Sequence, residues 1–150
     1  MSDSTQLRQL VKDLLESQLL AVLATHSQGQ PHTSLLAFAS TEDLAGLLFV
    51  TSRDTQKYSN ALAGYRVAML MDNRTNRPSD FTEAVAVTAV GTVEEVTGDR
   101  RNYLARLFLT KHPSLEGFLN NPAQALMEVR VDFYHIARFD SQEVLPIRGL

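Results

Sequence analysis

The sequence contains neither cysteine nor tryptophan among its 150 residues. Without cysteine there are no disulfides, no thiolate nucleophiles and no zinc or iron–sulfur sites held by cysteine. No run of 18 or more apolar residues occurs, so we expect no membrane-spanning helix. The opening stretch, MSDSTQLRQLVKDLLESQ, has no basic segment followed by an apolar core, unlike a secretory signal. Together these absences favour a cytoplasmic location.

An excess of basic charge is also missing, because 14 Lys and Arg face 17 Asp and Glu, for a formal net charge of -3. Nucleic-acid-binding proteins usually carry a basic patch, so we do not expect a nucleic-acid partner. The closest basic cluster, Arg100, Arg101 and Arg106, is expected to be a solvated helix face. A length of 150 residues and a hydrophobic content of 44% suit a single globular domain over 1–150.

Apolar residues at helical spacing predict several short helices. We expect them over residues 7–18, 54–63, 99–109 and 114–119. Asp3 or Ser4 can cap the first helix, because a short polar side chain accepts a hydrogen bond from the first turn. Gly64 is placed to end the second helix in a left-handed conformation.

Short apolar runs between turn residues predict six strands, with a seventh near the C-terminal end. They cover 19–25, 32–40, 47–51, 66–71, 84–96 and 126–139, with 143–147 as the seventh. Because the connections are short, the sheet should be largely antiparallel. Gly91, inside a strand, marks a bulge or a close backbone approach. We expect a mainly β fold: a six-stranded antiparallel split β-barrel with peripheral helices.

The most informative stretch is Leu47–Asn60, LLFVTSRDTQKYSN, in which a strand passes through a polar turn into a helix. Asp54 or Thr55 should cap this helix. Lys57 falls in its first turn, where a cation opposes the helix dipole unless an anion is bound. We interpret the stretch as a site for a phosphate on a small ligand, with an ordinary strand-to-helix connection as the alternative. It lacks the glycines of Walker and Rossmann phosphate loops.

Together these stretches resemble the pyridoxamine 5'-phosphate oxidase-like superfamily of FMN-binding split barrels, from the first helix to Phe139. That family has a G-x-P hairpin turn, then a ligand-lining strand, then an aromatic-x-Thr-x-x-x-Ser-x-Lys segment running into a helix. The corresponding segments here are Gly29-Gln30-Pro31, 34–39 and 49–57. The segment 111–118 looks like the short single-domain members rather than the oxidase itself.

The resemblance implies a flavin site. Lys57 matches the family's phosphate-binding lysine, Thr51 its threonine and Thr55 its serine. The implied cofactor-binding residues are Ser34, Leu35, Leu36, Ala37, Val50, Thr51, Ser52, Thr55, Gln56, Lys57 and Arg74.

Two positions on the phosphate side depart from the family pattern. Ser34 stands where the family has an arginine, and Gln56 stands where it has a basic residue. Arg74 is a candidate for the missing cation, either in the same chain or from a partner chain. The Trp and Arg-Leu-His segments that contact the oxidase's substrate have no counterpart, so we do not expect pyridoxamine 5'-phosphate oxidase activity itself.

The function that the resemblance implies is an FMN-dependent oxidoreductase of unknown substrate, acting as a homodimer with its sites at the interface. A deazaflavin is an alternative cofactor. A flavin carrier without catalysis and a heme-binding relative are alternative functions. His135 is the late histidine of the chain, although its surroundings do not match those of the heme-binding branch. No metal site is expected, because His26 and His32 flank a turn with no carboxylate beside them.

Overall fold

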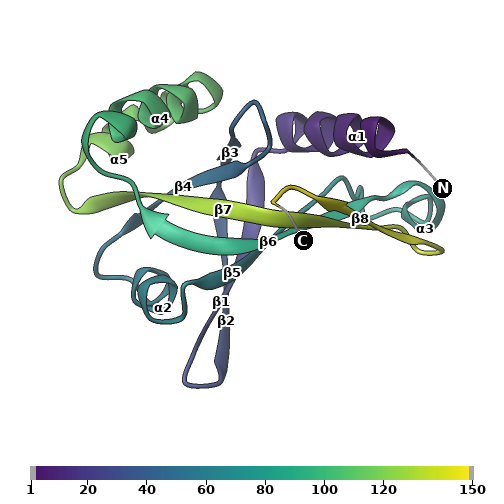
Figure 1. The fold of residues 1–150 in the computed structure, drawn as a ribbon, viewed down its shortest axis with the longest axis horizontal. Helices are drawn as coiled ribbons and strands as arrows, with labels where there is room; N and C mark the ends of the chain where they lie inside the picture. Colours follow the sequence, from purple (N-terminus) through teal and green to yellow (C-terminus); the bar gives the residue numbers. More distant parts are fainter. Residues whose placement is uncertain (1–2, 149–150) are drawn as a thin grey trace.

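The computed structural model describes residues 3–148 and contains one antiparallel sheet of eight strands with helices around it (Figure 1). The strand order is β2-β1-β5-β6-β7-β4-β3, with β8 paired to β7. The strands are β1 Leu20–Ser27, β2 Gln30–Ala37, β3 Ala39–Ser40, β4 Gly46–Ser52, β5 Arg66–Asp72, β6 Ala86–Glu95, β7 Gln124–Ala137 and β8 Gln142–Pro146. The helices are α1 Ser4–Ser17, α2 Gln56–Gly64, α3 Asp80–Glu83, α4 Gly98–Lys111, the 3-10 helix η1 Pro113–Leu115 and α5 Glu116–Asn120. Within the described residues, no helix has the length and apolar character needed to span a bilayer.

The expected fold class is confirmed: the protein is mainly β, and its antiparallel sheet curls into a split barrel. The sheet has eight strands rather than the expected six. One extra strand arises because the expected strand 32–40 is interrupted at Phe38, whose side chain is fully buried. The Phe38 N–H donates to the carbonyl of Leu19 (3.3 Å), so the chain turns inward there. The other is β8, the seventh strand anticipated near the C-terminal end.

The curl of the sheet creates a seam. β2 and β3 stand at opposite ends of the strand order, yet a single residue, Phe38, separates them in the chain. The sheet therefore bends until β2 contacts β4, although no ladder of backbone hydrogen bonds joins these two strands in residues 3–148. This unpaired seam positions the candidate site described below.

Two apolar clusters hold the fold together. The larger one fills the inside of the curled sheet, and α1 closes it with Val11 and Leu15, which are fully buried. Asp3 caps α1, as expected, by accepting a hydrogen bond from the Gln6 N–H (2.8 Å). The smaller cluster lies where α4 and α5 pack on the outer face of β4 and β7. Its members include Val50, Leu104, Phe108, Leu119 and Leu126.

The ends of α2 are fixed in different ways. Thr55, one of the two expected caps, begins the helix, and its side-chain oxygen accepts from the Tyr58 N–H (3.3 Å). The expectation that Gly64 takes the left-handed position was wrong, because that position is occupied by Tyr65 (φ 44°). Tyr65 is held there from both sides: its N–H donates to Ala61 (2.8 Å), and its carbonyl accepts from Val93 of β6 (2.8 Å).

Gly91 is a point of close backbone approach, as its place in the sequence suggested. The register of β6 against β7 shifts between Val90 and Gly91, which is a β-bulge. A Cβ atom at Gly91 would overlap the backbone carbonyl of Arg130 on β7. Only glycine fits, because a strand in the middle of the sheet cannot move without losing its ladder.

We predict that Gly91→Ala lowers the free energy of unfolding by about 2–3 kcal/mol, since the added methyl group overlaps main-chain atoms. Chemical denaturation measures the change. Gly117→Ala is the matched control, because nothing lies within 4 Å of a Cβ atom there. The control should be unchanged or up to about 1 kcal/mol more stable. Equal stability of the two variants would show that β6 and β7 can separate at Gly91.

Candidate functional site

A cavity of about 310 Å³ opens at the seam, where the end of β4 and the start of α2 face β2. We call it the seam cavity. Its lining residues are Leu35, Leu36, Ala37, Val50, Thr51, Ser52, Thr55, Lys57, Phe108, Leu115, Phe118 and Gln124. The first eight of these are among the cofactor-binding residues expected from the sequence. The structure therefore brings together two segments, 35–37 and 50–57, that only the resemblance had related.

Hydroxyl groups fix one end of the seam cavity. The Thr55 hydroxyl donates to the carbonyl of Ser52 (2.8 Å) and lies 3.0 Å from the hydroxyl of Thr51. The Ser52 hydroxyl donates to Asp54. These contacts join the last residues of β4 to the first turn of α2 with no glycine in the turn.

Lys57 supplies a positive charge at the same end. It is the second residue of α2, and it has no carboxylate partner in residues 3–148. The backbone N–H groups of Gln56 and Lys57 lack intrahelical acceptors, as at any helix start. An ammonium, helix N–H groups and nearby hydroxyls together form a donor set that suits a phosphate.

Apolar side chains form a wall of the seam cavity. Leu35 on β2 is 67% exposed and Phe118 on α5 is 45% exposed, so both present apolar surface. Phe108 and Leu115 continue this wall from α4 and η1. The seam cavity thus has one polar, positively charged end and one apolar side, as a ligand with a phosphate and a flat ring requires.

Four lining residues were not identified from the sequence: Phe108, Leu115, Phe118 and Gln124. They belong to α4, η1, α5 and the start of β7, more than 50 residues after Lys57. The sequence did predict a helix over 114–119, which contains two of these residues. Its pattern did not show which surface of the protein this helix covers.

Three expected site residues lie elsewhere. Ser34 is not among the lining residues and pairs with Leu23 in the β1–β2 ladder. The Gln56 side chain points along α2 and donates to Asn60 (2.6 Å). Arg74 forms an ion pair with Asp72 (3.2 Å) and lines a different cavity. Among the described residues of a single chain, one cation, Lys57, therefore lines the seam cavity.

The family model described as pyridoxamine 5'-phosphate oxidase matches residues 7–133. The chain belongs to this family. The match extends from α1 to β7 and so includes every lining residue of the seam cavity.

Solved structures share the oxidase-family fold at low sequence identity, which shows the fold alone. The heme-binding protein from Mycobacterium smegmatis is 13% identical with a TM-score of 0.81, over 97% of this chain and 59% of that one. This chain therefore spans about three fifths of that relative's length. An FAD-binding protein from Mesorhizobium loti is 16% identical with a TM-score of 0.65, over 83% and 89% of the two chains. General Stress Protein 26 from Bacillus anthracis is 18% identical with a TM-score of 0.67, over 94% and 98%. A search of curated proteins found no match.

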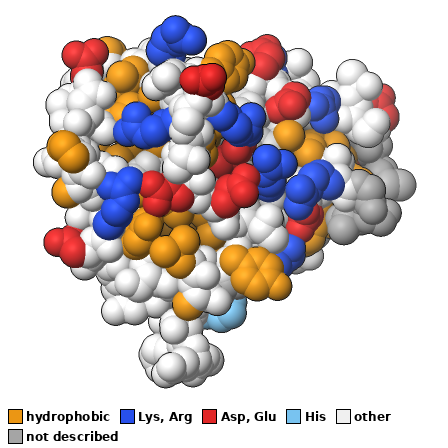
Figure 2. Space-filling model, turned by 60° about the vertical axis from the view of Figure 1, so that its left-hand side comes forward, with side chains coloured by type: hydrophobic (Ala, Val, Ile, Leu, Met, Phe, Trp, Pro, Cys, Tyr) orange, Lys and Arg blue, Asp and Glu red, His pale blue; other side chains and the backbone are white. Residues whose placement is uncertain are grey.

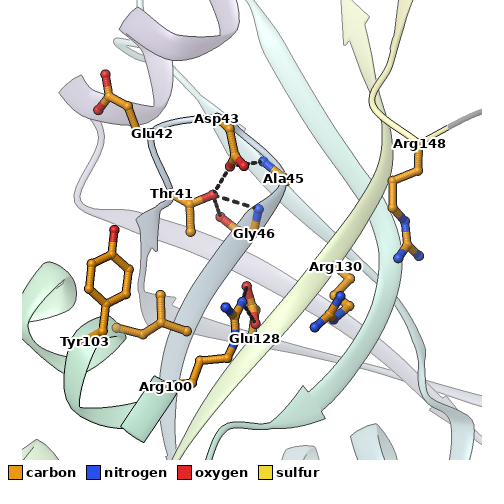
Figure 3. A pocket seen from close by; sticks show the side chains of 11 residues that line it. Thr41, Glu42, Asp43, Ala45, Gly46, Arg100, Tyr103, Glu128, Arg130 and Arg148 are labelled. Carbon is orange, nitrogen blue, oxygen red and sulfur yellow. Dashed lines mark hydrogen bonds and ion pairs between the residues drawn. The ribbon is translucent and has the colours of Figure 1, made fainter.

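The described residues that line a second cavity, of about 500 Å³, include three arginines, and each of these forms an ion pair (Figure 3). The ion pairs are Arg100 with Glu128 (2.6 Å), Arg130 with Glu94 (2.8 Å) and Arg148 with Asp132 (2.8 Å). Figure 2 shows basic and acidic side chains interspersed over one face of the molecule, so neither sign forms a continuous patch there. The second cavity is therefore balanced in charge, unlike the end of the seam cavity beside Lys57.

Lys111 is a half-buried amine whose contacts are structural. Burial lowers the pKa of Lys111 to about 8. Its ammonium donates to the carbonyl of Leu15 (2.8 Å) and lies 3.9 Å from the ring centroid of Phe38. These contacts connect the end of α4 to the end of α1 and to the turn between β2 and β3. These contacts explain why a lysine is half-buried here, and no bound ligand is needed to explain it.

Arg100 lies on an exposed helix face, as expected, with half of its side chain open to solvent, but it also forms a specific ion pair. One terminal nitrogen of its guanidinium lies 2.6 and 2.7 Å from the two carboxylate oxygens of Glu128, which is only 3% exposed. Glu128 lies over Gly46 of the neighbouring strand, where a Cβ atom would overlap its carboxylate. Glycine at this position makes room for the buried charge, and Arg100 neutralises it.

We predict that Arg100→Ala lowers the free energy of unfolding by about 2 kcal/mol, because it leaves the Glu128 carboxylate buried without a counter-charge. Chemical denaturation measures the loss. Arg106→Ala, on an exposed position of the same helix, should change stability by no more than about 0.5 kcal/mol. Replacing both partners, Arg100→Met with Glu128→Leu, should recover most of the loss. If the two arginine variants lose the same stability, the ion pair contributes nothing.

Proposed function

We propose that the seam cavity binds FMN, with the phosphate at the end that holds Lys57 and the ring against the apolar wall. Lys57 carries this proposal. An ammonium in the first turn of a helix is unfavourable without an anion, and this one has no ionic partner in residues 3–148. Three hydroxyl-bearing residues, Thr51, Ser52 and Thr55, line the cavity beside it.

The apolar lining residues also suit FMN. A flavin ring needs a flat apolar surface, and Leu35 and Phe118 present one whose exposure a bound ring would reduce. The same two side chains leave the cavity open on one side. We propose that a second copy of the chain covers this side, so that the protein acts as a homodimer with its two sites at the interface.

The activity we propose is a flavin-dependent oxidoreduction in the cytoplasm. The bound flavin supplies the electron transfer, and the chain supplies binding and orientation. None of the twelve lining residues is Asp, Glu, His, Cys or Tyr, so the cavity offers no side chain suited to proton transfer apart from Lys57. Such a site accepts a deazaflavin on the same phosphate-binding residues. It does not include the substrate-binding residues of pyridoxamine 5'-phosphate oxidase.

Heme is the second candidate, because one structural relative is a heme-binding protein. Heme iron in proteins is held by an axial His, Cys, Met or Tyr, and the seam cavity is lined by none of them. His135 lies on β7, where its Nε2 is 3.2 Å from Oε1 of Gln142 on β8. The donor set of the seam cavity therefore favours FMN over heme.

We predict that Lys57→Ala weakens FMN binding at least tenfold, about 1.4 kcal/mol, because the phosphate loses the cation that the described residues of this chain bring to the cavity. Quenching of flavin fluorescence during titration gives the dissociation constant. Gln56→Ala is the matched control: it is adjacent on α2, but its side chain bonds to Asn60 outside the cavity. Its affinity should stay within about twofold of wild type.

The same titration with heme, followed through the Soret band, separates the two candidates. A wild-type protein that binds heme and no flavin would refute the FMN proposal. Unchanged FMN affinity in Lys57→Ala would remove Lys57 from the site.

A further inference from the structure

Among the buried side-chain nitrogen and oxygen atoms of residues 3–148, one has no hydrogen-bond partner in the protein: Oε1 of Gln124. Proteins rarely leave a buried polar atom unpaired, because its desolvation costs about 1–3 kcal/mol. Each such atom therefore requires a specific explanation. Gln124 lines the seam cavity, so this orphaned acceptor stands where a ligand is proposed to bind.

The backbone fixes the place of Gln124. It is the first residue of β7, and its N–H donates to Asn121 (2.9 Å). In the β4–β7 ladder it stands directly opposite Ser52. Side chains of paired residues lie on the same face of a sheet, so the Gln124 amide is next to the hydroxyl end of the cavity. It is not part of the apolar wall.

The chemistry of the orphaned atom restricts the ligand. An amide oxygen accepts hydrogen bonds and needs an O–H or N–H donor. An ionised phosphate offers acceptors, and a porphyrin ring around iron offers no donor. A flavin offers two kinds of donor, the N3–H of its ring and the hydroxyl groups of the chain that joins the ring to the phosphate. Gln124 stands opposite Ser52, at the end proposed for the phosphate, so the chain hydroxyls are the donors on its side of the cavity. Among the candidate ligands, a polyol phosphate satisfies both Lys57 and Gln124.

We infer that Gln124 is a specificity-determining residue that accepts a hydrogen bond from a hydroxyl of the chain between ring and phosphate. The seam cavity would then select ligands that carry a hydroxylated chain, whether the ring is a flavin or a deazaflavin. This inference rests on the proposed flavin function and adds a residue that the sequence comparison did not indicate.

The test uses Gln124→Leu, which keeps the approximate size of the side chain and removes the amide. Three ligands are titrated against wild type and variant: FMN, riboflavin, which lacks the phosphate, and lumiflavin, which also lacks the hydroxylated chain. We expect FMN and riboflavin each to bind about fivefold more weakly to the variant, the value of one hydrogen bond. Lumiflavin should bind both proteins equally. Gln142→Leu, an exposed glutamine on β8, is the matched control and should change none of the affinities.

The thermal midpoint of the ligand-free Gln124→Leu variant is a second measurement. A glutamine with a purely structural role would lower this midpoint when replaced, whereas an unpaired glutamine would not. Replacing an unpaired buried oxygen by an apolar group should leave the thermal midpoint of the ligand-free variant equal to or above that of wild type. A lowered midpoint would show that the amide already has a partner in the free protein and would overturn the inference. If the leucine variant does not fold, Gln124→Met repeats the test.

The pattern of affinities for the three ligands distinguishes the other possible roles of Gln124. Loss of FMN affinity alone would show that the amide donates to the phosphate, and loss of lumiflavin affinity would place it at the ring; either result overturns the hydroxyl assignment. Unchanged affinity for all three ligands would remove Gln124 from the site while leaving the flavin proposal intact. A wild-type protein that binds none of the three would refute the flavin proposal itself.

Discussion

The hydroxyl of Thr55 determines where Lys57 stands. This one oxygen donates to Ser52 (2.8 Å), contacts the Thr51 hydroxyl (3.0 Å) and accepts the Tyr58 N–H (3.3 Å). It therefore ends β4, begins α2 and sets the direction in which α2 leaves the sheet. Thr55 and Lys57 consequently line the seam cavity at the N-terminal end of α2, where the helix has N–H groups without intrahelical acceptors. A phosphate at that point would satisfy donors that the fold cannot satisfy itself.

The seam between β2 and β4 provides the space for that arrangement. Because β2 continues through a single residue, Phe38, into β3 at the other end of the strand order, the sheet must curl on itself. The curl brings β2 to β4 without joining them by a backbone ladder. An open edge is normally a liability in a β protein. Here α5 and the first turn of α2 border it, and the space between them has both an apolar and a charged side.

Local patterns explain which features could be predicted from the sequence. Caps at Asp3 and Thr55 and the bulge at Gly91 depend on a few neighbouring residues, and each was found in the structure. The contiguous segments 35–37 and 50–57 were also recognised, because the motif that carries them is short. That the two segments would meet followed from the family resemblance and not from the pattern itself.

Features that depend on distant contacts could not be predicted. Tyr65 takes a left-handed conformation because Val93, on β6, holds its carbonyl. The ion pair of the half-exposed Arg100 was not foreseen, because it depends on the register of β7, which places the buried Glu128 beside it. Gln124 and Phe118 enter the cavity through the packing of α5 and the start of β7, whose positions no local periodicity encodes.

We propose above all that the seam cavity recognises the phosphate of a flavin. Titration of the wild-type protein with FMN and with riboflavin tests it most directly, because the two ligands differ only in that group. A phosphate held by Lys57, helix N–H groups and hydroxyls should make FMN bind at least tenfold more tightly, a difference of about 1.4 kcal/mol. Equal affinities would contradict the claim and would leave the polar end of the seam cavity as an ordinary strand-to-helix connection.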